Sequence, residues 1–484
     1  MRLKRVLIAL VSLVVLAGIA VGVVTGTFGG WARSGLEATG LYSDGGASSL
    51  VPGGLGASAS ASTVSPTPSG AGPSAPAAPI LKPVLAAATP AAKPSAAAVT
   101  KLINGVDRKG VGDAFSGTVI DVGTGAVLYQ HKATTGFIPA STMKLLTTTA
   151  ALSLIGPDHR FTTKVVAPTS GSIVLVGGGD PYFASKSGNG KASVPALAKR
   201  TAAALKKKGV RTVSLGYDAS LFTGPAWNPT WPSFYADQVS KVSALSVDEG
   251  RVTGFSPGPR VPDPPAAAAK AFAAALKKQG IAVTKTSKTK APSGAALVAS
   301  VDSLPAERIV ELLLMASDND AAEVMFRQAA IAAKQPASFD GGRKAVHDRL
   351  VKLGILDSSV RIVDGSGLSR NTRVPADSMA KALRVASEEN HPELRGVITG
   401  LPVAGVEGSL RIRFFDPKAS AGRGLVRAKT GTLSKVHSLA GVVRAPDGSM
   451  LAYAFIVNNP KNEWNSIVWL DRVTASLVRC GCRG

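Results

Sequence analysis

The chain has 484 residues, enough for two or three domains, and its 55 Lys and Arg against 31 Asp and Glu give a formal net charge of +24. A chain this basic is expected to bind anions, but aromatic residues do not interleave its lysine runs and the N-terminal segment indicates export, so nucleic acid is excluded as a partner. Anionic polymers outside the cell or lipid head groups fit the charge better, and a purely solubilising role fits it equally well.

Residues 1–25 have the pattern of a membrane-directing segment. Arg2, Lys4 and Arg5 precede a run of about 19 uncharged residues, 6–24, which is close to the length that crosses a bilayer. The basic residues place the N-terminus in the cytoplasm. The run is long for a cleaved signal peptide, and no small-x-small cleavage site follows it. We therefore favour a retained signal-anchor over a cleaved signal peptide, and both predict that the rest of the chain lies on the extracytoplasmic face of the membrane.

Residues 26–96 are predicted to form a disordered linker, because they consist mainly of Gly, Ser, Ala, Pro and Thr. Such a segment cannot bury enough apolar surface to fold. As a flexible coil of about 70 residues it spans on the order of 45 Å. This length suits a domain that works at a distance from the membrane.

The first folded elements are predicted after the linker. Residues 97–106 have the pattern of a short helix, and 115–121 and 126–129 that of a hairpin. A loop ending at Ala140 then leads into a helix whose apolar residues, up to Leu152, form one buried stripe.

Ser141 and Lys144 stand three positions apart at the start of this last helix. Residues at this spacing share one helix face, so the lysine nitrogen can reach the serine oxygen. The pattern predicts a serine nucleophile whose proton partner is a lysine. A helix-capping role for Ser141 stays open, because serine is a favoured N-cap residue. A second Ser-x-x-Lys, 287–290, lies in a Lys-rich polar run and is interpreted as solvated surface.

Residues 164–290 are predicted to be an inserted α/β region. A strand over 173–176 is followed by two units of a helix, a glycine and a strand, 202–213 and 273–284. The two units indicate either an internal repeat or two independent uses of a common pattern, and we favour the second.

Ser317 and Asn319 are predicted to lie between two helices, one opened by Pro305 and one covering 321–333. Polar side chains at such a junction can point into a cleft. Another Ser-x-Asn, 187–189, lies in a Gly-rich loop with no element to position it.

The C-terminal part supplies a third polar motif and the remaining strands. A Gly/Ser loop covers 364–371, and Lys429-Thr-Gly431 reads as a strand entering a turn. Strands over 439–443 and 451–457 and a helix over 464–477 follow. Because strands occur at both ends of the folded region with helices between them, we expect one sheet built from both ends.

The ordered set of Ser141-x-x-Lys144, Ser317-Asp-Asn319 and Lys429-Thr-Gly431 resembles the penicillin-binding, active-site-serine DD-peptidases over residues 97–478. It is most similar to the D-alanyl-D-alanine carboxypeptidase/endopeptidase family with a large insertion, the S13-type low-molecular-mass penicillin-binding proteins. The features that support this are about 176 positions between Ser141 and Ser317, Gly177-Gly-Gly-Asp-Pro181 and residues 217–224 in the insertion, and Asp364-Gly-Ser-Gly-Leu-Ser-Arg370.

The resemblance implies an α/β (α+β) fold with a serine DD-peptidase/β-lactamase-like core. The core would combine residues 97–163 and 291–484, and the inserted accessory region would cover 164–290. It implies no metal and no cofactor. Its implied partners are peptidoglycan stem peptides, β-lactam antibiotics, and the membrane through the N-terminal segment.

The resemblance also implies acyl transfer to Ser141 Oγ, which attacks the carbonyl between two D-alanines. Lys144 takes the serine proton, and Ser317 and Lys429 relay a proton to the leaving amine. The backbone N–H groups of Ser141 and Thr432 form an oxyanion hole. The implied catalytic residues are Ser141, Lys144, Ser317, Asn319 and Lys429, and the implied substrate-binding residues are Thr430, Gly431, Thr432 and Arg370.

Arg370 resembles a position that recognises the free end of the stem peptide, although an Arg in a Gly/Ser loop can also cap a turn. Some relatives carry an acidic residue in the stretch matching 231–235, and this chain does not. Asp218 and His437 are interpreted as structural. For the C-terminal cysteines, Cys480 and Cys482, a labile disulfide, an intermolecular link and no role all remain open.

Three other classes of protein were weighed. A β-lactamase shares the three motifs, but no Glu-x-x-x-Asn water-positioning element lies between Ser317 and Lys429, and Glu323 and Glu388 have the wrong spacing. A non-catalytic scaffold that binds the cell wall through its basic surface does not require the complete motif set. A Ser–His–Asp hydrolase lacks its Gly-x-Ser-x-Gly element. The sequence therefore favours the DD-peptidase.

Overall fold

The computed structural model describes residues 95–357 and 360–480. The predicted signal-anchor, all but the last residues of the predicted linker, and Cys482 lie outside the described residues. Within the described part, no helix has the length and apolar character needed to cross a bilayer.

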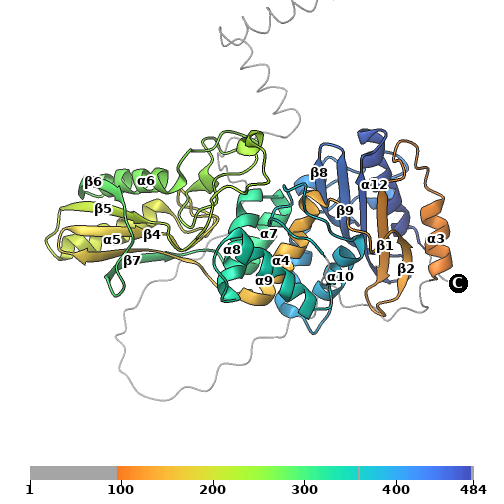
Figure 1. The fold of residues 1–484 in the computed structure, drawn as a ribbon, viewed down its shortest axis with the longest axis horizontal. Coiled ribbons are helices and arrows are strands. Elements are labelled where there is room, and N and C mark those ends of the chain that lie inside the picture. The colour runs from red at the N-terminus through yellow and green to blue at the C-terminus, as the bar shows by residue number, and fades with distance from the viewer. Residues whose placement is uncertain (1–94, 358–359, 481–484) are drawn as a thin grey trace, which may run out of the picture. The chain divides into compact units, whose positions relative to one another are not determined.

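A five-stranded antiparallel sheet combines strands from both ends of the folded region, as the sequence predicted. Its strand order is β2-β1-β10-β9-β8 (Figure 1). The strands are β1 (Phe115–Asp121), β2 (Val127–His131), β8 (Arg427–Leu433), β9 (Val436–Arg444) and β10 (Met450–Asn458). β1 pairs with β10 from Phe115 opposite Val457 to Asp121 opposite Leu451.

Helices cover both faces of this first sheet because its central strands are apolar on both sides. In β10, Tyr453 and Phe455 belong to the core under α12 (Glu463–Val478), whereas Ala454 and Ile456 belong to the core on the opposite face. Successive strand residues point to opposite faces, which produces this division. The short N-terminal helix α3 (Ala96–Asn104) packs beside α12.

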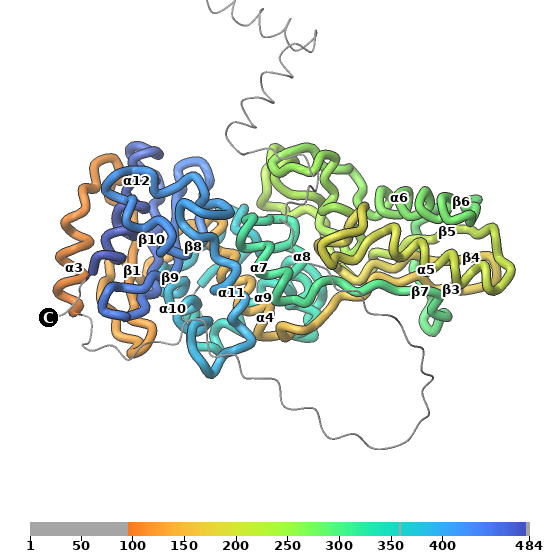
Figure 2. The backbone as a smooth tube through the Cα atoms, turned by 180° about the vertical axis from the view of Figure 1, so that it is seen from behind, coloured from red at the N-terminus to blue at the C-terminus, as the bar shows by residue number. Residues whose placement is uncertain are grey.

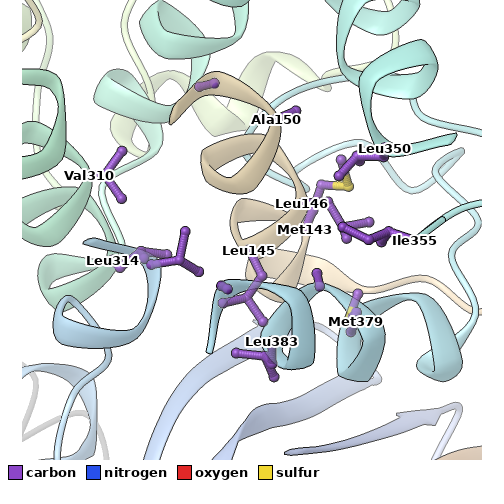
Figure 3. Close-up of a cluster of buried hydrophobic side chains, with 14 of the residues drawn as sticks. Met143, Leu145, Leu146, Ala150, Val310, Leu314, Leu350, Ile355, Met379 and Leu383 are labelled. Carbon is purple, nitrogen blue, oxygen red and sulfur yellow. The ribbon is translucent and has the colours of Figure 1, made fainter. Parts of the chain in front are cut away.

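A layer of helices lies on the other face of the first sheet and surrounds α4 (Met143–Ile155). Figure 3 shows apolar side chains of neighbouring helices converging on Leu145 and Leu146 of α4. The surrounding helices are α7 (Ala306–Ala316), α8 (Asn319–Ala332), α9 (Phe339–Lys352), α10 (Ala376–Ala386) and the short α11 (Arg395–Thr399).

The predicted single buried stripe on α4 is wrong, because all residues from Met143 to Leu152 are buried. Polar residues on a helix enclosed on every side need partners inside the protein. The threonines find them in carbonyl oxygens: Thr148 Oγ1 donates to Lys144 over 2.7 Å and Thr149 Oγ1 to Leu145 over 2.7 Å.

A second five-stranded sheet, in the order β6-β5-β4-β3-β7, occupies the predicted inserted region and extends past both of its predicted limits. Its last strand, β7, follows residue 290 in the sequence and pairs with β3. The strands are β3 (Thr162–Thr169), β4 (Ser172–Val176), β5 (Thr212–Asp218), β6 (Ala282–Lys288) and β7 (Ala296–Asp302).

Two helices pack on each other and on this second sheet, α5 (Val194–Lys207) and α6 (Pro264–Lys278) (Figure 2). Each leads through a glycine with positive φ, Gly209 or Gly280, into a strand. The two strands, β5 and β6, are parallel neighbours. The two helix–Gly–strand units predicted from the sequence therefore lie side by side.

Candidate active site

Ser141 lies in a one-turn 3-10 helix, η1 (Ala140–Thr142), which leads directly into α4. Ala140 before it has a φ of 50°, which turns the chain sharply. Ser141 does not cap the helix, since the residue before α4 is Thr142 and neither helix has a side-chain cap bond. The hydroxyl of Ser141 instead accepts a hydrogen bond from Lys144 Nζ over 3.0 Å.

Lys144 is fully buried, and its three N–H positions meet three oxygens. Besides Ser141 Oγ, Lys144 Nζ donates to Asn319 Oδ1 over 2.6 Å and to the Ser366 carbonyl oxygen over 2.9 Å. Burial lowers the pKa of Lys144 to about 8, against the opposing effect of nearby carboxylates, Glu323 first. The amine is therefore close to the protonation balance that a general base near neutral pH needs.

Ser317 and Asn319 meet the site from the junction of α7 and α8. Ser317 ends α7 in the left-handed conformation, with φ 56° and ψ 38°. Asp318 caps α8 by accepting the Ala321 N–H over 3.0 Å, so its side chain turns back to the helix. Asn319 Oδ1 accepts from Lys144, and its Nδ2 donates to the Gln238 carbonyl over 3.0 Å.

Lys429 enters from the edge strand β8 on the side of Ser317. Its Nζ donates to Ser317 Oγ over 2.8 Å and to the Thr430 carbonyl over 2.9 Å. Complete burial lowers the pKa of Lys429 well below its usual range, and the nearby Lys144 lowers it further. The site thus holds two buried lysines, each bonded to a different serine hydroxyl.

A cavity of about 610 Å³ opens beside these groups. Ser141, Ser317, Asn319 and Thr432 line it from the core. The segment between β5 and β6 supplies the opposite wall, with Phe234, Tyr235, Asp237, Gln238, Arg251, Gly254, Phe255, Ser256 and Pro257. A substrate in this cavity would contact the hydroxyl of Ser141 and the side chain of Asn319 together.

Comparison with known proteins places the chain in a family. The family model described as D-Ala-D-Ala carboxypeptidase 3 (S13) matches residues 99–256 and 253–475. This chain belongs to the S13 D-Ala-D-Ala carboxypeptidase family. It is therefore a serine peptidase, and the S13 resemblance predicted from the sequence is confirmed.

Its relatives among characterised proteins cover most of its length. A carboxypeptidase of Mycobacterium tuberculosis is 34% identical over 426 residues, covering 84% of this chain and 90% of that protein. Carboxypeptidase DacB of Mycolicibacterium smegmatis is also 34% identical, over 85% of this chain and 89% of that protein. The crystal structure of penicillin binding protein 4 from Haemophilus influenzae has the same fold, with a TM-score of 0.64 and 21% identity over 79% of this chain and 99% of that one.

The other residues of the third motif in this S13 enzyme lie on β8 beside the cavity. Thr430 Oγ1 donates to Ser409 Oγ over 2.8 Å. A Cβ added to Gly431 would lie 2.7 Å from the Pro139 carbonyl oxygen, so only glycine lets β8 approach the turn before Ser141 this closely. Ser438 Oγ of β9 also donates to that carbonyl, over 2.7 Å.

Arg370 lies apart from the central cluster. It is exposed, is not among the cavity's lining residues, and donates to the Ser434 carbonyl in the turn between β8 and β9. This contact is of the turn-capping kind that the sequence left open.

Sequence reasoning missed two contributors to the site. The Ser366 carbonyl accepts from Lys144, and Glu323 accepts the backbone N–H groups of the same loop. Ser366 lay within a motif that was singled out, but a backbone acceptor leaves no sequence signal. Glu323 had a usable signal, since it follows Asn319 by four positions and so shares its helix face.

The segment between β5 and β6 also forms ion pairs with acidic residues in the second motif and directly after it. Arg251 Nη2 lies 2.7 Å from Asp318 Oδ2, and Arg260 Nη2 lies 3.1 Å from Asp320 Oδ2. The Ser240 N–H donates to Asp320 over 2.6 Å. These contacts fix the start of α8 and therefore the position of Asn319.

Proposed function

We propose that this S13 enzyme hydrolyses the D-Ala-D-Ala terminus of peptidoglycan stem peptides through an acyl-enzyme on Ser141. The observation that carries the proposal is the 3.0 Å contact between Ser141 Oγ and Lys144 Nζ, an amine whose pKa burial lowers to about 8. A neutral amine at this distance can accept the hydroxyl proton as the oxygen attacks the substrate carbonyl.

The proton then needs a route to the leaving amine. We assign it to Ser317 and Lys429, whose polar atoms lie 2.8 Å apart. The Ser317 hydroxyl gives its proton to the amine nitrogen as the C–N bond breaks, and the proton that Lys144 took from Ser141 replaces it through Lys429. Water then attacks the acyl carbon and gives a proton to the Lys144 amine, which passes it to Ser141 Oγ as the C–O bond breaks. The products are the shortened peptide with a carboxylate and the released amine.

Substrate binding is assigned to residues around the cavity. Asn319 Nδ2 would exchange its bond to Gln238 for one to the substrate amide. Thr430 and Lys429 would bind the terminal carboxylate, with Gly431 keeping β8 close to the Ser141 turn. The backbone N–H groups of Ser141 and Thr432 would stabilise the oxyanion. Arg370 would meet the free end of the stem peptide after exchanging its bond to Ser434.

The same chemistry would cleave cross-links, because only the identity of the leaving amine changes. β-Lactams would acylate Ser141 by the same attack. We place this reaction on the extracytoplasmic face of the membrane, with residues 1–25 as the anchor, 26–96 as the tether, 97–163 and 291–484 as the core, and 164–290 as the accessory region, to which β7 adds a strand. This placement rests on the composition of the N-terminal segments.

The test is to incubate the purified full chain with benzylpenicillin and to follow its intact mass, alongside release of D-Ala from a D-Ala-D-Ala peptide. A persistent single adduct that is absent in Ser141→Ala, together with D-Ala release, is the expected result. An adduct that clears while the drug is consumed would indicate a β-lactamase. A folded protein that forms no adduct would contradict the catalytic role of Ser141 and favour a wall-binding scaffold.

A further inference from the structure

Glu323 is a buried carboxylate one helical turn after Asn319 on α8. Its side chain is fully buried, and no Lys, Arg or His of the described residues lies within ion-pair distance of it. Lys144, Asp364 and Arg327 interact with it electrostatically, without a direct ion pair or hydrogen bond to it. A buried carboxylate with no cationic partner is costly, so its hydrogen bonds define what it does.

Glu323 accepts hydrogen bonds from two consecutive backbone N–H groups, and it also interacts with the hydroxyl of Ser366. Oε2 accepts from Gly365 over 3.1 Å, and Oε1 accepts from Ser366 over 2.7 Å. The Gly365 carbonyl is fixed as well, since Thr147 Oγ1 of α4 donates to it over 2.7 Å. Glu323 and Thr147 therefore set the orientation of the two peptide groups on either side of Gly365.

This short segment is the part of the loop that meets Lys144. The Ser366 N–H points to Glu323, and the Ser366 carbonyl accepts from Lys144 Nζ over 2.9 Å. Asp364 accepts the N–H groups of Gly367 over 3.1 Å and Ser369 over 2.6 Å, and the Gly367 N–H belongs to the same peptide group as the Ser366 carbonyl. Ser366 is thus held on both sides: Glu323 and Thr147 fix the peptide group before it, and Asp364 fixes the peptide group that carries its carbonyl.

The direction of this contact decides where the lone pair of Lys144 points. A neutral lysine amine has two N–H bonds and one lone pair. Asn319 Oδ1 and the Ser366 carbonyl can accept the two N–H bonds, which leaves the lone pair for the third position, at Ser141 Oγ. If the Ser366 carbonyl turned away, one N–H would lose its acceptor and the amine could rotate about its Cε–Nζ bond.

We propose that Glu323 is a positioning residue for the reaction: it fixes the peptide group before Ser366 and so, together with Asp364, keeps the Ser366 carbonyl aimed at Lys144, whose neutral amine then presents its lone pair to Ser141. This inference rests on the proposed function, because it assumes that Lys144 is the base. Glu323 touches neither the substrate nor the reacting atoms. Burial raises the pKa of Glu323 itself to about 8, and in its ionised form this carboxylate raises the pKa of Lys144, so it also tunes the base that it positions.

The experiment measures acylation by benzylpenicillin and hydrolysis of a D-Ala-D-Ala peptide across pH for the full-length wild type and Glu323→Gln. Gln has nearly the same shape, but its NH₂ group would face one of the two backbone donors. We expect acylation and kcat to fall by roughly tenfold to 100-fold, with KM within about twofold, because a misdirected base slows the chemical step. The acid limb of the pH profile should move to lower pH near pH 8, where Glu323 begins to ionise and to raise the pKa of Lys144, because Gln carries no such charge.

The control is Glu389→Gln, an exposed glutamate, which should match the wild type. Wild-type rates and an unshifted pH profile in a folded Glu323→Gln would overturn the inference, as would equal losses in kcat and affinity with an unshifted profile. If this variant does not fold, Glu323→Asp is measured instead; it should show the same fall in acylation and kcat but keep the wild-type pH profile, because Asp retains the carboxylate. Failure of both variants to fold would make Glu323 a folding residue only. These outcomes can be distinguished from failure of the proposed function, because in that case the wild type itself would not be acylated.

Discussion

Lys429 Nζ donates a hydrogen bond to Ser317 Oγ over 2.8 Å, although the two residues are 112 positions apart in the chain. The amine is fully buried, and burial beside Lys144 holds its pKa well below the usual lysine range. Ser317 therefore has a buried amine of its own at hydrogen-bond distance, separate from Lys144, through which a proton can be passed to its hydroxyl.

Ser317→Ala should slow both acylation and D-Ala release by about 100-fold or more, because the leaving amine loses its proton source. Combining it with Lys429→Met should cost no more than the greater single loss, since the two groups act as one unit. Stopped-flow acylation of the three variants tests this. Losses that multiply would show that the two groups act independently.

The pH dependence of acylation should follow Lys144. Its pKa is lowered to about 8, so the neutral base is the minor form below that pH and the major form above it. The acylation rate should rise about tenfold per pH unit below 8 and level off above it. Benzylpenicillin acylation measured from pH 5.5 to 9.5 tests this, and a flat profile between pH 6 and 9 would contradict Lys144 as the base.

Thr430→Val should weaken binding of the substrate carboxylate. The hydroxyl of Thr430 lies on β8 beside Lys429 and bonds Ser409 in the free enzyme. Losing a hydrogen bond to a charged group costs about 1.5–3 kcal/mol, so KM should rise about tenfold or more while kcat changes little. Ser409→Ala is the matched control, because it removes the partner and keeps the hydroxyl. An unchanged KM in Thr430→Val would remove this residue from the carboxylate site.

Gly367→Ala should disturb the turn that holds Ser141. Gly367 has a φ of 81°, and an added Cβ would lie 2.8 Å from Met143 Cβ and closer still to the Ala140 carbonyl oxygen. The variant should lose clearly more than about 1 kcal/mol of unfolding free energy and should acylate more slowly. Gly354→Ala is the control that separates backbone strain from steric contact. Gly354 also has a positive φ, 68°, but no atom lies within 4 Å of the added Cβ. Equal effects of the two substitutions on acylation would contradict the contact argument.

Arg251→Met should destabilise the start of α8, because it leaves the Asp318 carboxylate without its cation. The side chain of Asp318 is 3% exposed and that of Arg251 17% exposed. Breaking such a pair should cost about 3 kcal/mol in unfolding free energy, measured by denaturant unfolding. Arg343→Met, which breaks an exposed pair with Asp340, should have little effect. Similar stability of the two variants would show that the Arg251 contact contributes little.

The sequence predicted the elements whose causes are local. Ser141 and Lys144 are on one helical face, and Ser317 and Asn319 are on a helix junction, so short-range spacing was sufficient. The sheet built from both ends was also predictable, because alternating or continuous apolar runs occurred only at the two ends of the core. The closeness of the three motifs came from the family resemblance, and the described side chains bring those five residues together.

Long-range packing was not predictable from the sequence. The enclosure of α4 on every side depends on α7, α8, α9 and α10, none of which can be placed around it from periodicity alone. The pairing of β7 with β3 joins strands more than a hundred residues apart. The role of the Ser366 carbonyl depends on backbone direction, which any residue at that position could supply.

The pairing of β1 with β10 has a consequence for synthesis of the protein. β10 lies between β1 and β9, so a ribosome completes the two outer hairpins, β1–β2 and β8–β9, before it makes the strand that joins them. A message cut short before Met450 would yield a chain with two unjoined hairpins, each with an open strand edge. Such a product is exposed to proteases and to aggregation. We therefore expect that a gene shortened at its 3′ end yields no active enzyme, rather than a less active one.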